Sequence, residues 1–230
     1  MDKLSTLKKL LIPAKGLILD FDGLLADSER FHFIAYNEVF KRYGHTLDEK
    51  EYYKYWTSLG RGAQGEIERH GLDLDPVEIR REKMPIFSRY CEDGTIKLFE
   101  DAREMIERLS RMGKRMAIAS GTPASDVRAV LRNAGVDGVF EAVFGSDTVP
   151  KIKPAPDVFL KTLYALGLSP KQCLVFEDAE KGIFAAIDAG IPVVIVRTPQ
   201  TKEFDFSRAD LTVESHTEMV RLLRSLDLRV

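Results

Sequence analysis

Residues 16–24 read GLILDFDGL, a short apolar run that ends in two aspartates, Asp20 and Asp22. The apolar residues are continuous rather than alternating, which is typical of a strand buried on both faces of a parallel sheet. Aspartate is rarely buried unless it is paired, and Gly23 follows this pair at once. The stretch therefore predicts a buried strand whose carboxyl end has a chemical task.

Four more apolar runs have the same character: RMAIAS (115–120), AVFGS (142–146), CLVFED (173–178) and VVIVR (193–197). Amphipathic segments lie between or beside them, at 100–112, 124–134, 156–167 and 180–190. Alternation of strands with helices predicts an α/β fold with a doubly wound, mostly parallel sheet.

Residues 28–92 break this alternation, because they contain no convincing apolar strand. Helical patterns such as ERFHFIAYNEVF (29–40) follow one another instead. We predict an inserted helical domain at 25–94, and an α/β core made of 1–24 and 95–230. The aromatic residues around Trp56 are expected to pack the small core of the helical domain.

The composition excludes several classes of protein. The 230 residues include 34 Lys and Arg against 36 Asp and Glu, a net charge of −2, which gives no basic field for nucleic acid. No apolar run approaches the ~20 residues of a membrane span. The first 14 residues have no signal-peptide pattern, and we expect a short leader to the first strand. Only two cysteines occur, Cys91 and Cys173, so we expect a cytoplasmic protein.

Chemically active side chains follow successive predicted strands. Active sites in open α/β sheets lie beyond the carboxyl ends of the strands. The residues at those ends, or in the loops beyond them, are Asp20, Asp22, Ser120, Gly121, Thr122, Lys153, Glu177 and Asp178. Taken singly, each has an ordinary reading, such as a turn, a solvated lysine or a helix N-cap. Their occurrence in this order favours a shared site.

Two acidic pairs in one site are electrostatically costly unless a divalent cation lies between them, and oxygen ligands of this kind suit Mg²⁺. A hydroxyl, a lysine and backbone N–H groups suit the oxygens of a phosphoryl group. One aspartate can then attack phosphorus and form an acyl phosphate. The second can act as general acid and then as general base.

The order of these motifs resembles that of the haloacid dehalogenase superfamily. The motifs are DFDGLLADSE (20–29), IASGT (118–122), KPAPDVF (153–159) and VFEDAEKGIFAAIDAG (175–190). The insertion after the first motif resembles the α-helical cap of the branch that includes β-phosphoglucomutase and phosphoglycolate phosphatase. The resemblance implies a Rossmann-like core with this cap.

The resemblance also implies roles for matching residues. Asp20 would be the nucleophile and a Mg²⁺ ligand, and Asp22 the acid/base with its backbone carbonyl on the metal. Asp178 would ligate the metal, with Glu177 supporting it. The residues that would hold the phosphoryl group or the rest of the substrate are Ser120, Lys153, Gly23, Gly121, Thr122, His32, Arg61 and Lys83. An aspartate at position 22 implies phosphate ester hydrolysis or phosphomutase chemistry rather than dehalogenation.

The choice between phosphatase and mutase depends on the cap. His32 and Lys83 match or fall near cap residues of the mutases. However, Ala63 occupies the place of the arginine that grips the second phosphate there, and Arg61 is displaced from it. We therefore expect a Mg²⁺-dependent phosphatase for a small phosphorylated metabolite, such as a sugar or polyol phosphate.

Two alternatives stay open at this stage: a hexose-phosphate mutase, and a catalytically weak regulatory protein that binds a phosphorylated metabolite. We expect a monomer, with a dimer as the alternative, and no nucleic-acid or membrane partner.

Overall fold

The computed structural model describes residues 2–58, 60–202 and 204–226. The chain divides into two compact units, one made of Met1–Asp27 with Lys97–Val230 and the other of Ser28–Ile96. The larger is an α/β unit and the smaller is entirely helical in its regular structure. Each unit is described by itself.

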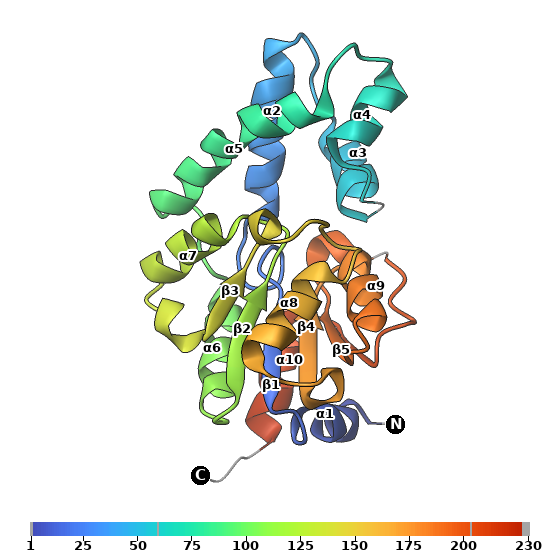
Figure 1. Ribbon diagram of the computed structural model, residues 1–230. Coiled ribbons are helices and arrows are strands. Elements are labelled where there is room, and N and C mark those ends of the chain that lie inside the picture. Colours follow the sequence, from blue (N-terminus) through green and yellow to red (C-terminus); the bar gives the residue numbers. More distant parts are fainter. Residues whose placement is uncertain (1, 59, 203, 227–230) are drawn as a thin grey trace. The chain divides into compact units, whose positions relative to one another are not determined.

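The α/β unit is built on a parallel sheet of six strands in the order β3-β2-β1-β4-β5-β6 (Figure 1). The strands are β1 (Gly16–Leu19), β2 (Arg115–Ala119), β3 (Ala142–Phe144), β4 (Cys173–Glu177), β5 (Val193–Val196) and β6 (Leu211–Val213). The predicted α/β fold with a doubly wound parallel sheet is confirmed. β1 lies in the middle of the sheet and all four of its residues are buried, which explains its continuous apolar sequence.

Helices cover both faces of this sheet. They are α1 (Lys3–Leu11), α6 (Glu100–Ser110), α7 (Ala124–Asn133), α8 (Asp157–Leu166), α9 (Glu180–Asp188) and α10 (His216–Ser225). Figure 1 shows α8 and α9 in front of the sheet and α6 and α10 behind it. Short 3₁₀ turns occupy Asp137–Val139, Ser146–Thr148, Pro170–Gln172 and Pro199–Thr201. The core between α8, α9 and the strands includes Ile18, Phe159 and Val175, which are fully buried or nearly so.

Two elements differ from the expectation. Residues 1–14 are not merely a leader, because Lys3–Leu11 form helix α1, which Asp2 caps and which buries Leu7 and Leu11. The edge strand β6 has only three residues, Leu211–Val213, so it is too short to show a hydrophobic period in the sequence.

The helical unit contains α2 (Glu29–Arg42), α3 (Glu49–Glu51), a π-helical segment (Tyr52–Ser58), α4 (Gly62–His70) and α5 (Pro76–Glu92). Its aromatic residues form much of its core, as expected. The Trp56 ring lies 4.6 Å from that of Tyr36 and 5.0 Å from that of Tyr52, between ring centroids. Burial of Tyr52 and Trp56 joins the π-helical segment to α2. Within the described part of the chain, no helix is both long enough and apolar enough to cross a membrane.

The adjacent residues Phe159 and Leu160 on α8 allow a test of this core. Phe159 is fully buried and Leu160 is 47% exposed. Phe159→Ala should lower the free energy of unfolding by about 3–5 kcal/mol because it leaves a cavity under the sheet. Leu160→Ala should change it by no more than about 0.5 kcal/mol. Urea unfolding of both variants measures the difference, and similar losses in the two would contradict this placement of α8.

Candidate active site

The carboxyl edge of the sheet brings the predicted strand-end residues together. β1 pairs with β2 on one side and with β4 on the other. The N–H of Asp20 donates to the carbonyl oxygen of Phe176 at 2.9 Å, and that of Ser120 to Phe144 at 3.0 Å. Both ladders thus continue past the named strands, which fixes the backbone from which these side chains project.

Lys153 binds two carboxylates in the interior of this edge. Its Nζ lies 2.7 Å from Asp20 Oδ1 and 2.6 Å from Glu177 Oε1, and it also donates to the carbonyl oxygen of Ala119 at 2.8 Å. The three residues Asp20, Lys153 and Glu177 are all buried. Because an ammonium group has three donors, these contacts fix the lysine completely.

The buried charges do not balance. Burial, and then the nearby charge of Glu177, raise the pKa of Asp20 to about 7, although Lys153 acts in the opposite direction. Burial acts to lower the pKa of Lys153, but the two carboxylates outweigh it and raise that pKa above its ordinary value. One cation therefore serves two anions, and the site has an excess of negative charge.

Helix α9 begins against the Glu177 carboxylate. Glu177 Oε2 accepts the N–H groups of Asp178 at 3.0 Å and Ala179 at 3.2 Å. A Cβ atom at Gly182 would lie 1.9 Å from the Glu177 carboxyl carbon. Only glycine at 182 leaves room for this carboxylate, which is also favourably placed at the start of a helix.

Three carboxylates could hold a cation at this edge. One ligand atom from each of Asp20, Glu177 and Asp178 lies within 4.8 Å of the others, and all three residues are buried. Glu177 already binds Lys153 and two N–H groups, whereas Asp20 uses only Oδ1 for the lysine. The hard oxygen donors and the excess negative charge fit Mg²⁺.

Gly23 lies directly against the third of these carboxylates. A Cβ atom at Gly23 would lie 2.2 Å from Asp178 Oδ2, and its φ of +76° is one that other residues rarely adopt. The glycine thus lets the loop after β1 pass close to Asp178.

Asp22 has a different environment from Asp20. It is half-buried, and its Oδ2 accepts the Ser120 hydroxyl at 3.0 Å. Ser120 Oγ in turn accepts the N–H of Thr122 at 2.9 Å. Gly121, between them, is exposed, and no other heavy atom lies within 4 Å of the place where a Cβ would be. The second aspartate thus lies beside a hydroxyl group, that of Ser120.

The expected cap residues belong to the helical unit. Lys83 is buried, and its Nζ lies 2.6 Å from His32 Nδ1. The rings of His32 and Phe87 stack with centroids 3.9 Å apart, and the Lys83 ammonium also lies 3.9 Å from the Phe87 ring. Arg61 lies just before α4 and is exposed. The structure therefore brings His32 and Lys83 together, whereas Arg61 lies on a different segment of the same unit.

Sequence reasoning missed His216, the first residue of α10. Its Nε2 lies 2.7 Å from the carbonyl oxygen of Leu24, in the loop that carries Asp22. Burial lowers the pKa of His216. Nothing in the sequence around this single histidine, which follows a short strand, indicates that it contacts the loop after β1.

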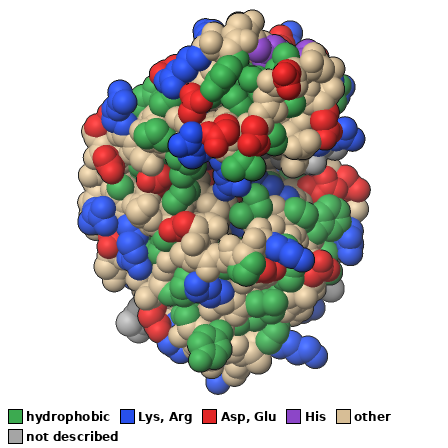
Figure 2. Space-filling view, turned by 45° about the horizontal axis from the view of Figure 1, so that its top comes forward, with side chains coloured by type: hydrophobic (Ala, Val, Ile, Leu, Met, Phe, Trp, Pro, Cys, Tyr) green, Lys and Arg blue, Asp and Glu red, His purple; other side chains and the backbone are tan. Residues whose placement is uncertain are grey.

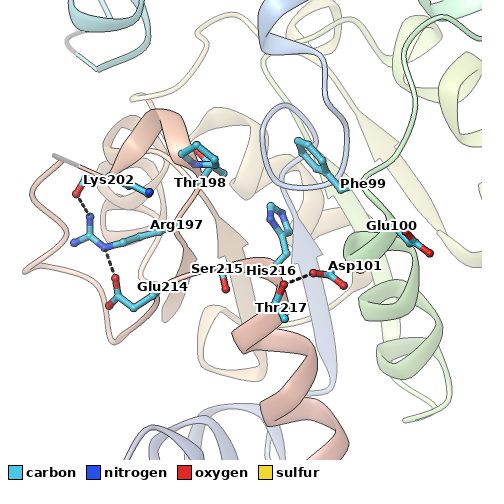
Figure 3. Close-up of a pocket in the computed structure, with 11 residues that line it drawn as sticks. Phe99, Glu100, Asp101, Arg197, Thr198, Lys202, Glu214, Ser215, His216 and Thr217 are labelled. Carbon is cyan, nitrogen blue, oxygen red and sulfur yellow. Dashed lines mark hydrogen bonds and ion pairs between the residues drawn. The ribbon is translucent and has the colours of Figure 1, made fainter.

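His216 also lines a pocket of about 520 Å³ beside the ends of β5 and β6 (Figure 3). Its polar side chains bind one another: Arg197 pairs with Glu214 at 3.3 Å, and the Thr217 hydroxyl donates to Asp101 at 2.5 Å. None of the predicted catalytic residues lines this pocket. The pocket is therefore distinct from the group of predicted catalytic residues.

Similarity to known proteins agrees with this geometry. A family model described as haloacid dehalogenase-like hydrolase matches residues 17–196. The fructose-1-phosphate phosphatase YqaB of Escherichia coli K12 is 38% identical over 184 residues, which are 79% of this chain and 96% of YqaB. Protein CbbY of Rhodobacter capsulatus is 33% identical over 208 residues, which are 85% of this chain and 91% of CbbY.

A solved structure has the same fold. A variant of CbbY from Rhodobacter sphaeroides, crystallised with xylulose-(1,5)bisphosphate, has a TM-score of 0.77 and 28% identity, and the match covers 89% of this chain and 96% of that one. The matched region includes every strand-end residue from Asp20 to Asp178. The chain belongs to the haloacid dehalogenase-like hydrolase family.

Proposed function

We propose that the protein is a Mg²⁺-dependent phosphatase that hydrolyses a small sugar phosphate through a phosphorylated Asp20. The observation that carries the proposal is the pair of differently placed aspartates. Asp20 is buried on Lys153, whereas Asp22 is half-buried on Ser120. One carboxylate can therefore attack while the other transfers a proton.

In the first half of the reaction, a carboxylate oxygen of Asp20 attacks phosphorus and the bond from phosphorus to the ester oxygen breaks. Asp22 gives its proton to the departing oxygen, which leaves as an alcohol. In the second half, Asp22 takes a proton from water as that water attacks the phosphorus of the acyl phosphate. Inorganic phosphate leaves and the Asp20 carboxylate is restored.

The remaining residues hold charge. Asp20 and Asp178 would ligate Mg²⁺, together with the backbone carbonyl of Asp22, and Glu177 would support the site through Lys153. When bound, the ion supplies positive charge that offsets the carboxylates and the phosphoryl oxygens. Lys153, the Ser120 hydroxyl and the backbone around Gly121 and Thr122 would hold the phosphoryl group, and Gly23 gives the loop its turn.

The substrate class is proposed from the relatives. YqaB is named for fructose 1-phosphate, and the CbbY structure contains a ketose bisphosphate. We propose that residues 25–94 act as the cap and that His32, Lys83 and Arg61 contact the sugar or a second phosphate. We also propose a monomer in the cytoplasm; the two cysteines, Cys91 and Cys173, are buried and form no disulfide, as a reducing compartment favours.

A second candidate is a hexose-phosphate mutase, and the contact between His32 and Lys83 favours it. A mutase must keep water away from the phospho-aspartate and return the phosphoryl group to the sugar. Ala63 in the place of the mutase arginine favours the phosphatase instead.

The first test is Asp20→Asn in a phosphate-release assay with Mg²⁺ and a panel containing fructose 1-phosphate and xylulose 1,5-bisphosphate. We expect wild type to release phosphate and the variant to lose about 10⁴-fold or more in kcat, because the amide cannot attack. Asp188→Asn, on the exposed end of α9, is the matched control and should keep full activity. Activity that survives in Asp20→Asn would exclude the mechanism, and conversion of a hexose 1-phosphate to the 6-phosphate without net release would assign the mutase.

The raised pKa of Asp20, about 7, predicts how Mg²⁺ affinity depends on pH. Below that pH the metal-free carboxyl group holds a proton, which the cation must displace. Affinity should therefore rise with pH, by about tenfold from pH 6 to pH 8, and then become constant. Calorimetric titration with Mg²⁺ measures this, and any weaker binding left in Asp20→Asn should lack the pH dependence. An affinity that falls over this range would refute the assignment.

The lack of room for a side chain at Gly182 gives a way to test whether Glu177 holds Lys153 in place. Gly182→Ala places a Cβ against the Glu177 carboxylate and should displace both residues, lowering kcat/KM by roughly 100-fold. It should also lower the melting temperature, although alanine is ordinarily the better helix former. Gly138→Ala is the control, since nothing lies within 4 Å of its Cβ position. Equal activity in the two variants would show that Glu177 has no such role.

A further inference from the structure

The helical unit contains a second group of possible metal ligands, with a different chemistry from the first. One ligand atom from each of His45, Glu66 and His70 lies within 4.8 Å of the others. His45 Nε2 lies 2.8 Å from Glu66 Oε1, and His70 Nε2 lies 3.3 Å from the same oxygen. Two imidazole nitrogens thus converge on one carboxylate oxygen.

The backbone holds these three side chains in place. Glu66 and His70 are four residues apart on α4, so they lie on the same face of that helix. His45 comes from the segment between α2 and α3, and its ring packs edge-on against Phe40 with centroids 5.5 Å apart. The rings of His45 and His70 lie 4.8 Å apart. Histidine side chains are visible at the surface of the helical unit (Figure 2). The side chains of His45 and His70 are 15% and 37% exposed, so an ion could reach them from solvent.

Glu66 is the most unusual residue of the three, because a glutamate side chain is rarely buried. Its side chain is only 3% exposed, and its other oxygen, Oε2, accepts Trp56 Nε1 at 3.3 Å and Arg69 at 2.6 Å. These contacts orient the carboxylate so that Oε1 faces the imidazoles. Zn²⁺ binds imidazole nitrogen and carboxylate oxygen at about 2.0–2.1 Å, so tetrahedral ligand atoms lie about 3.3 Å apart. The observed separations of 2.8 and 3.3 Å are close to that spacing.

We infer that His45, Glu66 and His70 form a binding site for Zn²⁺ or a similar transition-metal ion. Imidazole donors select such ions, whereas Mg²⁺ takes oxygen donors. Water or Glu51 completes the coordination, since Glu51 Oε2 lies 3.7 Å from His70 Nε2. The bound ion would join the segment after α2 to helix α4 and so stabilise the helical unit. This inference does not rest on the proposed phosphatase activity.

Arg69 sets a limit on the affinity. It binds Glu51 and Glu66, and its Nη2 also lies 3.2 Å from His70 Nε2, so it competes with a cation for that nitrogen and its charge opposes that of the cation. Arg69→Gln should therefore tighten metal binding. If these residues formed only structural ion pairs, the same change would lower the stability of the protein and would not create tighter metal binding.

The experiment titrates the full chain with Co²⁺ in excess Mg²⁺, which occupies the oxygen site, and follows visible absorption. Wild type should take up one Co²⁺ with the intense bands of a four-coordinate site, and Zn²⁺ should abolish them. His45→Ala and His70→Ala should each weaken binding by roughly 100-fold or more. His32→Ala, which removes a histidine of the same unit outside the group, should bind as wild type does.

Further variants make the outcome decisive. Asp178→Asn should keep the absorption, because it alters only the oxygen site. His70 has a 37% exposed side chain, so His70→Ala decides the matter if His45→Ala fails to fold by circular dichroism. Absence of the bands in wild type, or wild-type binding by both His45→Ala and His70→Ala, would overturn the inference.

Discussion

The arrangement of the α/β unit depends on one buried ammonium group, that of Lys153, which lies between two carboxylates. Lys153 joins the loop before α8 to β1 through Asp20 and to β4 through Glu177. Each of these charges would be expensive in the interior on its own, and removal of one partner leaves another uncompensated. The triad of Asp20, Lys153 and Glu177 thus requires the three segments that carry these residues to pack in one fixed arrangement. It also requires Gly182, since the carboxylate that anchors the lysine fills the space of a side chain there.

The same triad separates the two aspartates chemically. Asp20 is surrounded by protein and shares its lysine with a second anion, so it accepts a proton more readily than an ordinary carboxyl group. Asp22 lies two residues beyond Asp20, past the end of β1, where it is half-buried and accepts the hydroxyl group of Ser120. The two acids therefore have different surroundings although only Phe21 separates them in the sequence. The contact of His216 with the Leu24 carbonyl oxygen holds the loop that carries Asp22.

Much of the sheet could be predicted from the sequence, because continuous apolar runs with helical segments between them have few alternative explanations. β6 could not, since Leu211–Val213 offers only three residues for a pattern. Helix α1 was missed because Pro13 shortens its apolar stretch, whereas the burial of Leu7 and Leu11 becomes visible only in three dimensions.

The site shows the same division. Strand ends identified which residues gather, but not how they share protons and hydrogen bonds. The bond from Glu177 to Lys153 depends on side-chain directions from two distant segments, and sequence order contains no information about those directions. Likewise, His45 reaches Glu66 and His70 because the segment between α2 and α3 passes next to α4. This proximity could not be predicted from the positions of the three residues in the sequence.

The position of β1 has a consequence for how the chain is made. This strand is the first to leave the ribosome, yet its two neighbours in the sheet begin only at Arg115 and Cys173. The helical unit, residues 28–96, is complete in sequence before either neighbour exists. Nascent β1 must therefore remain without sheet partners while the insertion is synthesised. The N–H of Asp27 bonds to the carbonyl of Lys97 at 3.1 Å, which brings the two ends of the insertion together. A folded insertion would hold these ends close and shorten the loop that must close before β1 meets β2.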